Sequence, residues 1–443
     1  MFKRIISALL AAAMMLSLMA SCGKEVAEKP ANGETVNLEI WHTDPEDLDV
    51  TSNHQRYLKA ADKFMAVNEG YTVKVVGSVK AEKIMTALAS GAGPDICKAQ
   101  WQQAGAWGKE GIIADLTDFV NNDKEFDKDD IIPAAWDRAT YKGRIYSIPV
   151  TFNSSELYYN TDILAEAGVE APKTISELKK LAVDLTTYDE NGFITRAGYI
   201  PDYPWLDNVL WPIAAGASWI NPETNEITFD TEEMRYAYQW QVDIYNAIGY
   251  DKLQTFKTSL GTGANKPFLS GKTAMQFNGV KMPDEVAQYA PELNYGVTYV
   301  PYPDDKPELE GSMFCTITAL MLNNNSQNSK EDGWKLLSYI TGKETSAELA
   351  KGMNNTGAMM CRISALESLQ DMDTVLPIKK DVAKLMQNPN VKGFPMLTYV
   401  DQYLSVVADE MNKVFTDSNY TVEMATKAVQ EKVQPIADAN PIN

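Results

Sequence analysis

Apolar and polar residues follow a regular order over the first third of the chain beyond residue 34. The alternation in Val36–Trp41 predicts a strand. A helix is expected next, because five apolar residues recur there at helical spacing: Tyr57, Leu58, Ala61, Phe64 and Met65. A second strand at Tyr71–Val76 and a second helix at Lys80–Ala89 precede a glycine-rich stop and a third strand that includes Ile96. This β-α-β-α-β order predicts a parallel sheet covered by helices.

The rest of the chain continues the mixture of strands and helices. An extended segment is expected over Tyr146–Asn153, and a helix is predicted to begin at residue 160 or 161. Another helix is expected over Pro172–Leu178, where Thr174 and Glu177 have the spacing of a capping box. Towards the end of the chain the apolar positions recur at helical spacing. The expected fold class is therefore α/β.

The first 21 residues have the pattern of an export signal. Lys3 and Arg4 precede an apolar run from Ile5 to Ala20, which is too short to span a membrane comfortably. The run ends in Leu-Met-Ala-Ser-Cys, which resembles the bacterial lipobox and implies that Cys22 is lipidated. An ordinary cleavage site followed by a coincidental cysteine is the alternative. Residues 23–34 are polar, with Pro and Gly and no period, and are expected to form a flexible tether.

Charge and cysteine content exclude several classes of protein. The 443 residues carry a net charge of −20, and the first 21 hold two bases and no acids, so the remainder carries −22. A surface this acidic repels phosphate backbones, which makes nucleic acid a poor partner. Beyond Cys22, the three cysteines are an odd and widely spaced set, so we predict buried thiols rather than a disulfide framework or a zinc site.

Several segments together resemble the extracellular family 1 solute-binding proteins, the maltose-binding-like receptors of ABC importers. The segments are Ile40–Trp41; Ser90–Ile96 with Gly111–Leu116; Gly143–Pro149 with Tyr159–Asp162; Pro172–Leu178; and Phe268–Met275. Their order and spacing match the family from Val36 to the terminal helix. The resemblance implies a two-lobed, periplasmic-binding-protein-like fold, in which each lobe is a sheet covered by helices and the ligand cleft lies between the lobes.

Domain boundaries follow from the same resemblance. After the signal peptide (1–21) and the tether (22–34), lobe 1 is expected to contain residues 35–148 and about 320–360, and lobe 2 residues 149–319 and about 361–443. The chain is expected to cross between lobes near Pro149–Asn153, near Ser312–Ile317 and in the early 360s. Pro149 and Gly311 suit places where the chain changes direction.

Aromatic residues are the first candidates for ligand contacts, because sugars present C–H patches that stack on rings. Trp41 and Trp101 follow strand ends of lobe 1, where ligands bind in such sheets, and the resemblance places Trp205 and Trp211 at the cleft from lobe 2. Each of the four could instead be a core residue. Core positions are predicted for Trp107, Trp136, Trp240 and Trp334, which lie in apolar periodic runs.

Amide side chains suit sugar hydroxyls because they both donate and accept hydrogen bonds. Asn153 lies on the crossing strand, Gln102 follows Trp101, and Asn278 with Gly279 follows a later strand. Two carboxylates, Asp44 and Asp401, are weaker candidates because exposed carboxylates are usually only solvated.

Two departures bear on the ligand. Lys281 stands where many relatives place a Trp, which puts a stacking contact in doubt and admits a substrate with some negative charge, such as a uronic acid. Tyr158 and Tyr159 form a pair of the kind that ligates ferric iron in another branch of solute-binding proteins. His42 and His54 are the only histidines, so we expect at least one of the two tyrosine rings to be packed and predict no metal site.

The predicted function is that of a non-catalytic lipoprotein of an ABC importer. It would capture an oligosaccharide by lobe closure and deliver it to the membrane permease, as a monomer anchored at the outer face of the cytoplasmic membrane or the periplasmic side. One alternative is a receptor for a sugar acid, polyol phosphate or peptide, supported by Lys281. Another is an exported glycosidase, which needs two carboxylates about 5–10 Å apart. Hydrolase and nucleotide-binding motifs are absent, so no catalytic residue and no cofactor is predicted.

Overall fold

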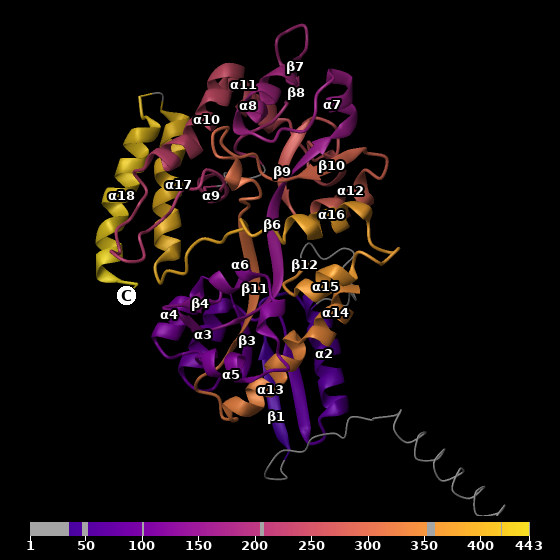
Figure 1. Ribbon diagram of the computed structural model, residues 1–443, viewed down its shortest axis with the longest axis vertical. Helices are drawn as coiled ribbons and strands as arrows, with labels where there is room; N and C mark the ends of the chain where they lie inside the picture. The colour runs from indigo at the N-terminus through magenta and orange to yellow at the C-terminus, as the bar shows by residue number, and fades with distance from the viewer. Residues whose placement is uncertain are drawn as a thin grey trace, which may run out of the picture.

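The computed structural model describes residues 35–46, 52–99, 102–203, 208–351, 359–417 and 419–442. The predicted α/β class is confirmed, and the elements form two groups along the long axis (Figure 1). We call the group around β1, β2 and β3 lobe 1 and the group around β9 and β10 lobe 2.

Lobe 1 contains the parallel sheet that the sequence predicts. Strand β1 (Val36–Trp41) pairs in parallel with both β2 (Tyr71–Val76) and β3 (Ile96–Ala99), and the first two helices are α2 (Asn53–Val67) and α3 (Ala81–Ala89). The other elements of this lobe are α4 (Gln103–Lys109), α5 (Thr117–Asn122), a 3-10 turn (Lys128–Asp130), α6 (Pro133–Asp137), β4 (Thr140–Tyr141), β5 (Arg144–Ile145), β11 (Cys315–Leu322), α13 (Lys330–Thr341), α14 (Lys343–Lys351), β12 (Met359–Met360) and α15 (Ile363–Ser368).

Lobe 2 is mostly helical around a small antiparallel sheet. Its elements are α7 (Thr161–Ala167), α8 (Ile175–Asp184), β7 (Thr187–Tyr188), β8 (Ile194–Arg196), α9 (Leu210–Ala214), α10 (Glu232–Ile248), α11 (Tyr250–Thr258), a 3-10 turn (Gly263–Asn265), β9 (Met275–Gly279), α12 (Met282–Tyr289), β10 (Tyr295–Thr298), a 3-10 turn (Pro307–Leu309), α16 (Pro377–Leu385), α17 (Val400–Thr416) and α18 (Val422–Ala439). The capping box at the start of α8 is confirmed: Thr174 accepts from the Glu177 amide, and the Glu177 carboxylate accepts from the Thr174 amide at 3.2 Å.

A single long strand joins the two lobes. Strand β6 (Ile148–Asn160) has 13 residues; its first half pairs with β11 and β12, and its second half pairs with β9 and β10. The change of partners falls between Ser154, which faces Cys315, and Ser155, which faces Gly279. Pro149 lies inside the strand beside a register shift in β11, where its missing amide hydrogen is tolerated. Gly311 has φ +85°, a left-handed conformation that favours glycine.

The chain crosses between lobes again in its C-terminal third. Helix α15 packs against α14 in lobe 1, whereas α16 packs against β10 in lobe 2, so the passage lies between residues 368 and 377. The segment after α16 returns to the boundary, where Lys392 bridges Phe314 beside the start of β11, and then leads to α17. Figure 1 shows these connections at the waist of the molecule.

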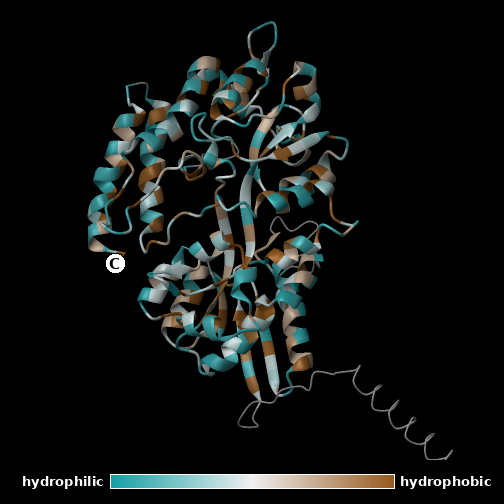
Figure 2. Cartoon of the chain, in the orientation of Figure 1, coloured by the Kyte–Doolittle hydropathy of each residue, from teal (hydrophilic) through white to brown (hydrophobic). Residues whose placement is uncertain are grey.

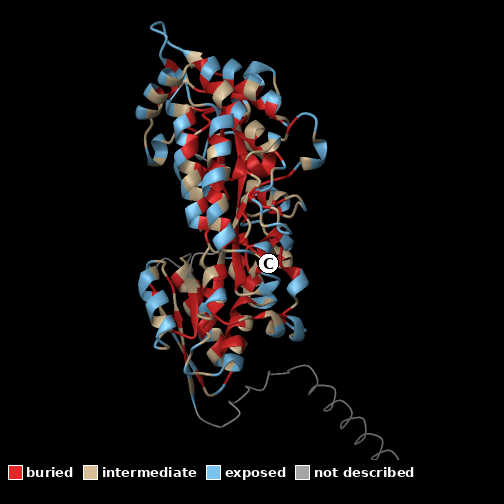
Figure 3. Cartoon of the chain, turned by 90° about the vertical axis from the view of Figure 1, so that its left-hand side faces the viewer, coloured by how far each residue is buried: buried red, intermediate tan, exposed pale blue. Residues whose placement is uncertain are grey.

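Buried residues fill the interior of both lobes (Figure 3), and most of them are apolar. The helices carry hydrophilic and hydrophobic segments side by side, as expected for elements with one packed face (Figure 2). Cys97, Cys315 and Cys361 are buried free thiols, as predicted, and burial raises the pKa of Cys97 to about 12. Trp107, Trp240 and Trp334 are buried, whereas Trp136 is only partly buried and donates from Nε1 to the Lys128 carbonyl oxygen at 3.1 Å. None of the described helices is long and apolar enough to cross a membrane.

Candidate functional site

A hollow of about 510 Å³ lies at the boundary between the lobes. Its walls come from three parts of the chain. The first is Asp137 and Thr140 at α6 and β4, and the second is Ile213 and residues 216–220 at α9 and the loop after it. The third is residues 392–396 of the segment between α16 and α17, which we call the connecting segment. Figure 1 shows α6 and β4 below α9, with the connecting segment between them. The volume is within the range of small-ligand pockets, roughly 300–1,000 Å³.

The lining of the hollow includes two buried aromatic residues and one charged residue of each sign. Trp219 is 4% exposed and packs against Phe394 with ring centroids 4.6 Å apart. Its indole nitrogen is buried and has no hydrogen-bond partner among the described residues. Burial raises the pKa of Asp137, although the nearby Arg138 and Lys392 cations oppose the shift. An exposed cation, Lys392, stands opposite on the connecting segment.

Strand ends of lobe 1 carry a second polar group. The Asp44 carboxylate forms an ion pair with Lys98, and its Oδ2 lies 3.6 Å from Nδ1 of the buried His42. His42 Nε2 in turn lies 3.0 Å from His54 Nδ1, and burial lowers the pKa of His42 to about 4. Burial raises the pKa of Asp44, but the Lys98 ammonium, a hydrogen bond from Asn53 and the nearby His42 together outweigh this, so the net shift of the pKa is downward. Asp44 is thus a charged acceptor held in place by its neighbours.

Two other predicted lobe 1 residues lie at the ends of β1 and β3. Trp41 is half-buried; its Nε1 donates to the Glu39 carboxylate at 2.8 Å, and Lys83 Nζ lies 5.4 Å from the ring centroid. Gln102 precedes α4, and its buried Oε1 has no hydrogen-bond partner among the described residues. Trp101 lies outside the described residues.

Three predicted lobe 2 residues meet at the strand junction. The Asn153 Oδ1 accepts from the Val280 amide at 3.3 Å, and the Asn278 Oδ1 accepts from the Gly279 amide at 2.8 Å. A Cβ atom on Gly279 would lie 2.7 Å from Asn153 Oδ1, so glycine is needed for this close approach. Asn153 faces Thr316 of β11, and the neighbouring Cys315 amide donates to the Lys392 carbonyl oxygen at 2.9 Å. Strand β11 therefore lies between Asn153 and the Lys392 side of the hollow.

The remaining lobe 2 predictions do not join this group. Lys281 and Asp401 are exposed, the first just before α12 and the second in the first turn of α17. Trp205 lies outside the described residues. Tyr158 is fully buried and donates its hydroxyl to the Gly279 carbonyl oxygen at 3.3 Å, in keeping with the expectation that at least one ring of the tyrosine pair is packed.

The prediction that Trp211 offers a stacking face is wrong for this structure. Trp211 is 1% exposed, and its ring meets Trp240 and Phe277 edge-on at centroid distances of 4.2 and 4.7 Å. All five residues of α9 are buried, because this short helix is enclosed on every side. No face of the ring remains for a ligand.

Comparison with known proteins identifies the family. Residues 51–347, about two thirds of the chain, match the family model described as bacterial extracellular solute-binding protein. The chain belongs to this family.

Relatives of this solute-binding protein include two curated sugar-binding proteins and many solved structures. It is 24% identical over 310 residues to the maltodextrin-binding protein MdxE of Bacillus subtilis, covering 66% of this chain and 67% of that one. It is 26% identical over 189 residues to a maltooligosaccharide ABC transporter solute-binding lipoprotein of Streptococcus pneumoniae, covering 40% of each. The cyclic α-maltosyl-1,6-maltose binding protein of Arthrobacter globiformis has the same fold, with a TM-score of 0.71, 20% identity, and coverage of 92% of this chain and 100% of that one.

Sequence reasoning about this solute-binding protein missed most of the hollow. Asp137, Trp219, Lys392 and Phe394 come from segments far apart in the chain, and none belongs to a recognisable motif. A weak signal was available at Trp219, a tryptophan in a short segment between Gly216 and Pro222, outside any periodic apolar run. Among the described residues there is no group of three or more side chains that could hold a metal ion.

Proposed function

We propose that this solute-binding protein captures an oligosaccharide between its lobes and delivers it, unaltered, to an ABC permease. The observation that carries the proposal is the hollow, which is built from both lobes and from the segment between α16 and α17 that runs along their boundary. A ligand held there contacts elements that move relative to one another, so it stabilises the closed arrangement by its higher affinity for that state. The names of the Bacillus and Streptococcus relatives support a carbohydrate as ligand.

The chemistry of the hollow suits a sugar. Ala217 and Pro395, both partly exposed, supply apolar surface, while Asp137, Thr140 and Ser218 supply hydrogen-bonding groups. We further propose that closure brings the residues predicted from the sequence into contact with the ligand. They are Trp41, Asp44, Trp101 and Gln102 from lobe 1, and Asn153, Trp205, Asn278, Gly279, Lys281 and Asp401 from lobe 2.

A binding role without catalysis fits the placement of acids. A glycosidase needs two carboxylates about 5–10 Å apart across the bond that it cleaves. Among the described residues that line the hollow, Asp137 is the one carboxylate. Incubating the protein with its tightest ligand and analysing the sugar afterwards tests this part, because a shortened product would contradict it.

Calorimetric titration with neutral oligosaccharides of defined linkage tests the ligand class. Binding of at least one glycan, with a change in tryptophan fluorescence, is the expected result. Asp137→Ala is expected to weaken binding, whereas Asp371→Ala, an exposed acid outside the hollow, serves as the matched control. If no glycan gave heat while another class of solute did, the carbohydrate assignment would fail.

A sugar acid is the second candidate ligand, because the exposed cation Lys392 lines the hollow of an otherwise acidic protein and Lys281 is exposed two residues after the end of β9. If the ligand carries a carboxylate, Lys281→Met and Lys392→Met are expected to weaken binding more at low salt than at high salt. A neutral ligand predicts little salt dependence for either variant.

Anchorage and assembly are also part of the proposal. Cys22 lies outside the described residues, and its lipidation is supported by the lipobox pattern and by the Streptococcus relative, which is named a lipoprotein. Mass spectrometry of the N-terminal peptide from membranes tests it, with Cys22→Ser as the control that should be released from the membrane. We propose a monomer with lobes divided as predicted from the sequence, except that the last crossing falls at residues 369–376.

A further inference from the structure

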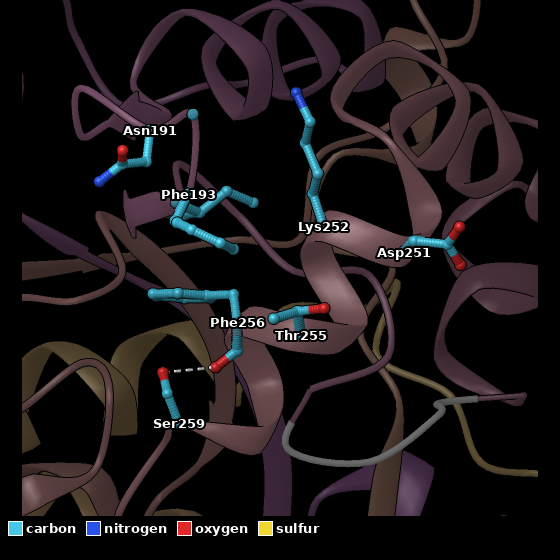
Figure 4. A pocket seen from close by; sticks show the side chains of 9 residues that line it. Asn191, Phe193, Asp251, Lys252, Thr255, Phe256 and Ser259 are labelled. Carbon is cyan, nitrogen blue, oxygen red and sulfur yellow. Dashed lines mark hydrogen bonds between the residues drawn. The ribbon is translucent and has the colours of Figure 1, made fainter.

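A second hollow lies at the far end of lobe 2, between the β7–β8 hairpin and α11. It has a volume of about 460 Å³, and its lining includes Asn191, Phe193, Lys252, Thr255 and Phe256 (Figure 4). The α11 residues of this lining are at positions 251, 252, 255 and 256, and the C-cap Ser259 follows them at helical spacing. This groove is separate from the boundary between the lobes, and nothing in the proposed function uses it.

The hairpin holds an aromatic ring out in solvent. Phe193 is 61% exposed, more than any other large hydrophobic side chain among the described residues. The turn that carries it is tightly fixed, because the Asp189 Oδ1 accepts from the Asn191 amide at 2.9 Å and from the Phe193 amide at 2.8 Å. Gly192 has φ +81°, as this turn requires. A single exposed apolar side chain is ordinary on a protein surface, but this hairpin exposes two aromatic rings, since Tyr188 is 44% exposed beside the turn.

Polar groups surround the ring in a pattern that fits a sugar. Phe256, which is 5% exposed, lies opposite Phe193 across the groove (Figure 4). The side-chain amide of Asn191 and the hydroxyl of Thr255 have no protein hydrogen-bond partner among the described residues. Tyr188, 44% exposed, extends the aromatic surface on the hairpin, and Lys252 Nζ lies 5.2 Å from its ring centroid. Aromatic rings stack on the C–H faces of a saccharide, and amide and hydroxyl groups form hydrogen bonds with its hydroxyls.

Charge and position narrow the class of ligand. Asp251 and Lys252 give the groove one charge of each sign, and the chain beyond residue 21 carries −22, so an anionic polymer would be repelled. The described chain starts at β1, at the opposite end of the long axis from the hairpin (Figure 1). If Cys22 is lipidated, as we propose, residues 23–34 attach the N-terminal end of lobe 1 to the membrane. The groove at the other end of the molecule would then face away from the membrane.

We propose that this groove is a second carbohydrate site, which binds neutral polysaccharide outside the cell and keeps the protein near its source of oligosaccharide. The site is independent of the cleft: it binds chain segments of a polymer, whereas the cleft encloses a short ligand.

Native gel electrophoresis in gels containing soluble galactomannan, amylopectin or hydroxyethyl cellulose tests the proposal. The chain from residue 23 onward is expected to be retarded by at least one polymer, and Phe193→Ala is expected to weaken this retention by at least about tenfold in apparent Kd. Tyr289→Ala, which removes a ring of 42% exposure on α12, is the matched control and should be retarded like the wild type. Asn191→Ala should give a smaller loss.

Two readouts separate the groove from the cleft. The groove has no tryptophan among its lining residues, so ligand-induced tryptophan fluorescence should be unchanged in Phe193→Ala. Asp137→Ala should lose oligosaccharide binding and still be retarded in the gel. The proposal is overturned if none of the polymers retards the protein, or if Phe193→Ala is retarded as strongly as the wild type. It is also overturned if Phe193→Ala keeps its retention but blocks cellular uptake, since the groove would then contact the permease.

Discussion

The Arg138 guanidinium donates from Nη2 to the backbone carbonyl oxygen of Cys315 at 2.6 Å. Arg138 is fully buried just after α6, its Cζ lies 5.1 Å from the centroid of the Phe314 ring, and Gly393 of the connecting segment lies directly against its Nε. The Arg138 side chain thus links the end of α6 to the start of β11 and to the connecting segment, where the lobes meet. Burial lowers its pKa to about 10, so it stays charged at neutral pH.

Gly393→Ala is expected to lower the free energy of unfolding by about 1–3 kcal/mol, because a Cβ atom at this position would overlap the Arg138 Nε. Thermal or urea unfolding measures the effect. A double-mutant cycle with Arg138→Met provides the control, since the alanine should cost less once the guanidinium is gone. Equal costs in both backgrounds would show that the two residues do not compete for space.

Trp211→Ala is expected to lower the free energy of unfolding by about 3–5 kcal/mol, because it empties a site enclosed by Trp240 and Phe277. Ligand affinity of the protein that remains folded should be nearly unchanged. Parallel urea titrations and calorimetry check both parts, and Trp211→Phe should recover much of the stability. If the variant unfolded like the wild type but bound ligand poorly, Trp211 would be a ligand-binding residue and not a core residue.

Burial of Glu156 is expected to make the protein less stable at alkaline pH. The side chain is 0% exposed on β6, its carboxylate is bonded by the Ser154 hydroxyl, and burial raises its pKa to about 8. The folded state therefore holds a proton that the unfolded chain releases near pH 4.5. This contribution is complete below about pH 4.5 and is lost as the pH rises through 8, by as much as about 5 kcal/mol. Glu156→Gln should remove it, so the variant should gain stability relative to the wild type between pH 5 and 9.

Burial of His42 is expected to make the protein less stable at acidic pH. It is 0% exposed beside His54 and Tyr57, and its pKa of about 4 lies below the ordinary 6.5, so the unfolded chain binds a proton first. Its contribution is complete above about pH 6.5 and is lost as the pH falls towards 4, by about 3 kcal/mol. In His42→Gln the unfolding free energy should depend less on pH between 6.5 and 4. An unaltered acid dependence would mean that other groups control it.

Sequence patterns predicted the elements that depend on local order. The alternation in Val36–Trp41 and the Thr174–Glu177 cap are properties of a few neighbouring residues, and both appear as expected. Trp211 could not be placed in this way, because an aromatic residue in an apolar run has the same pattern whether its ring faces the core or a cleft. Trp219 and Lys392 are 173 positions apart, and only tertiary folding brings them to one hollow.

Strand β11 lies between β6 and β3 in the sheet, although it follows β6 in the chain by more than 150 residues. A ribosome that has made β1, β2, β3 and β6 has therefore produced strands whose central neighbour does not yet exist. The nascent chain cannot close this sheet until Leu322 has been synthesised, so a long half-made product must be protected from aggregation during its synthesis.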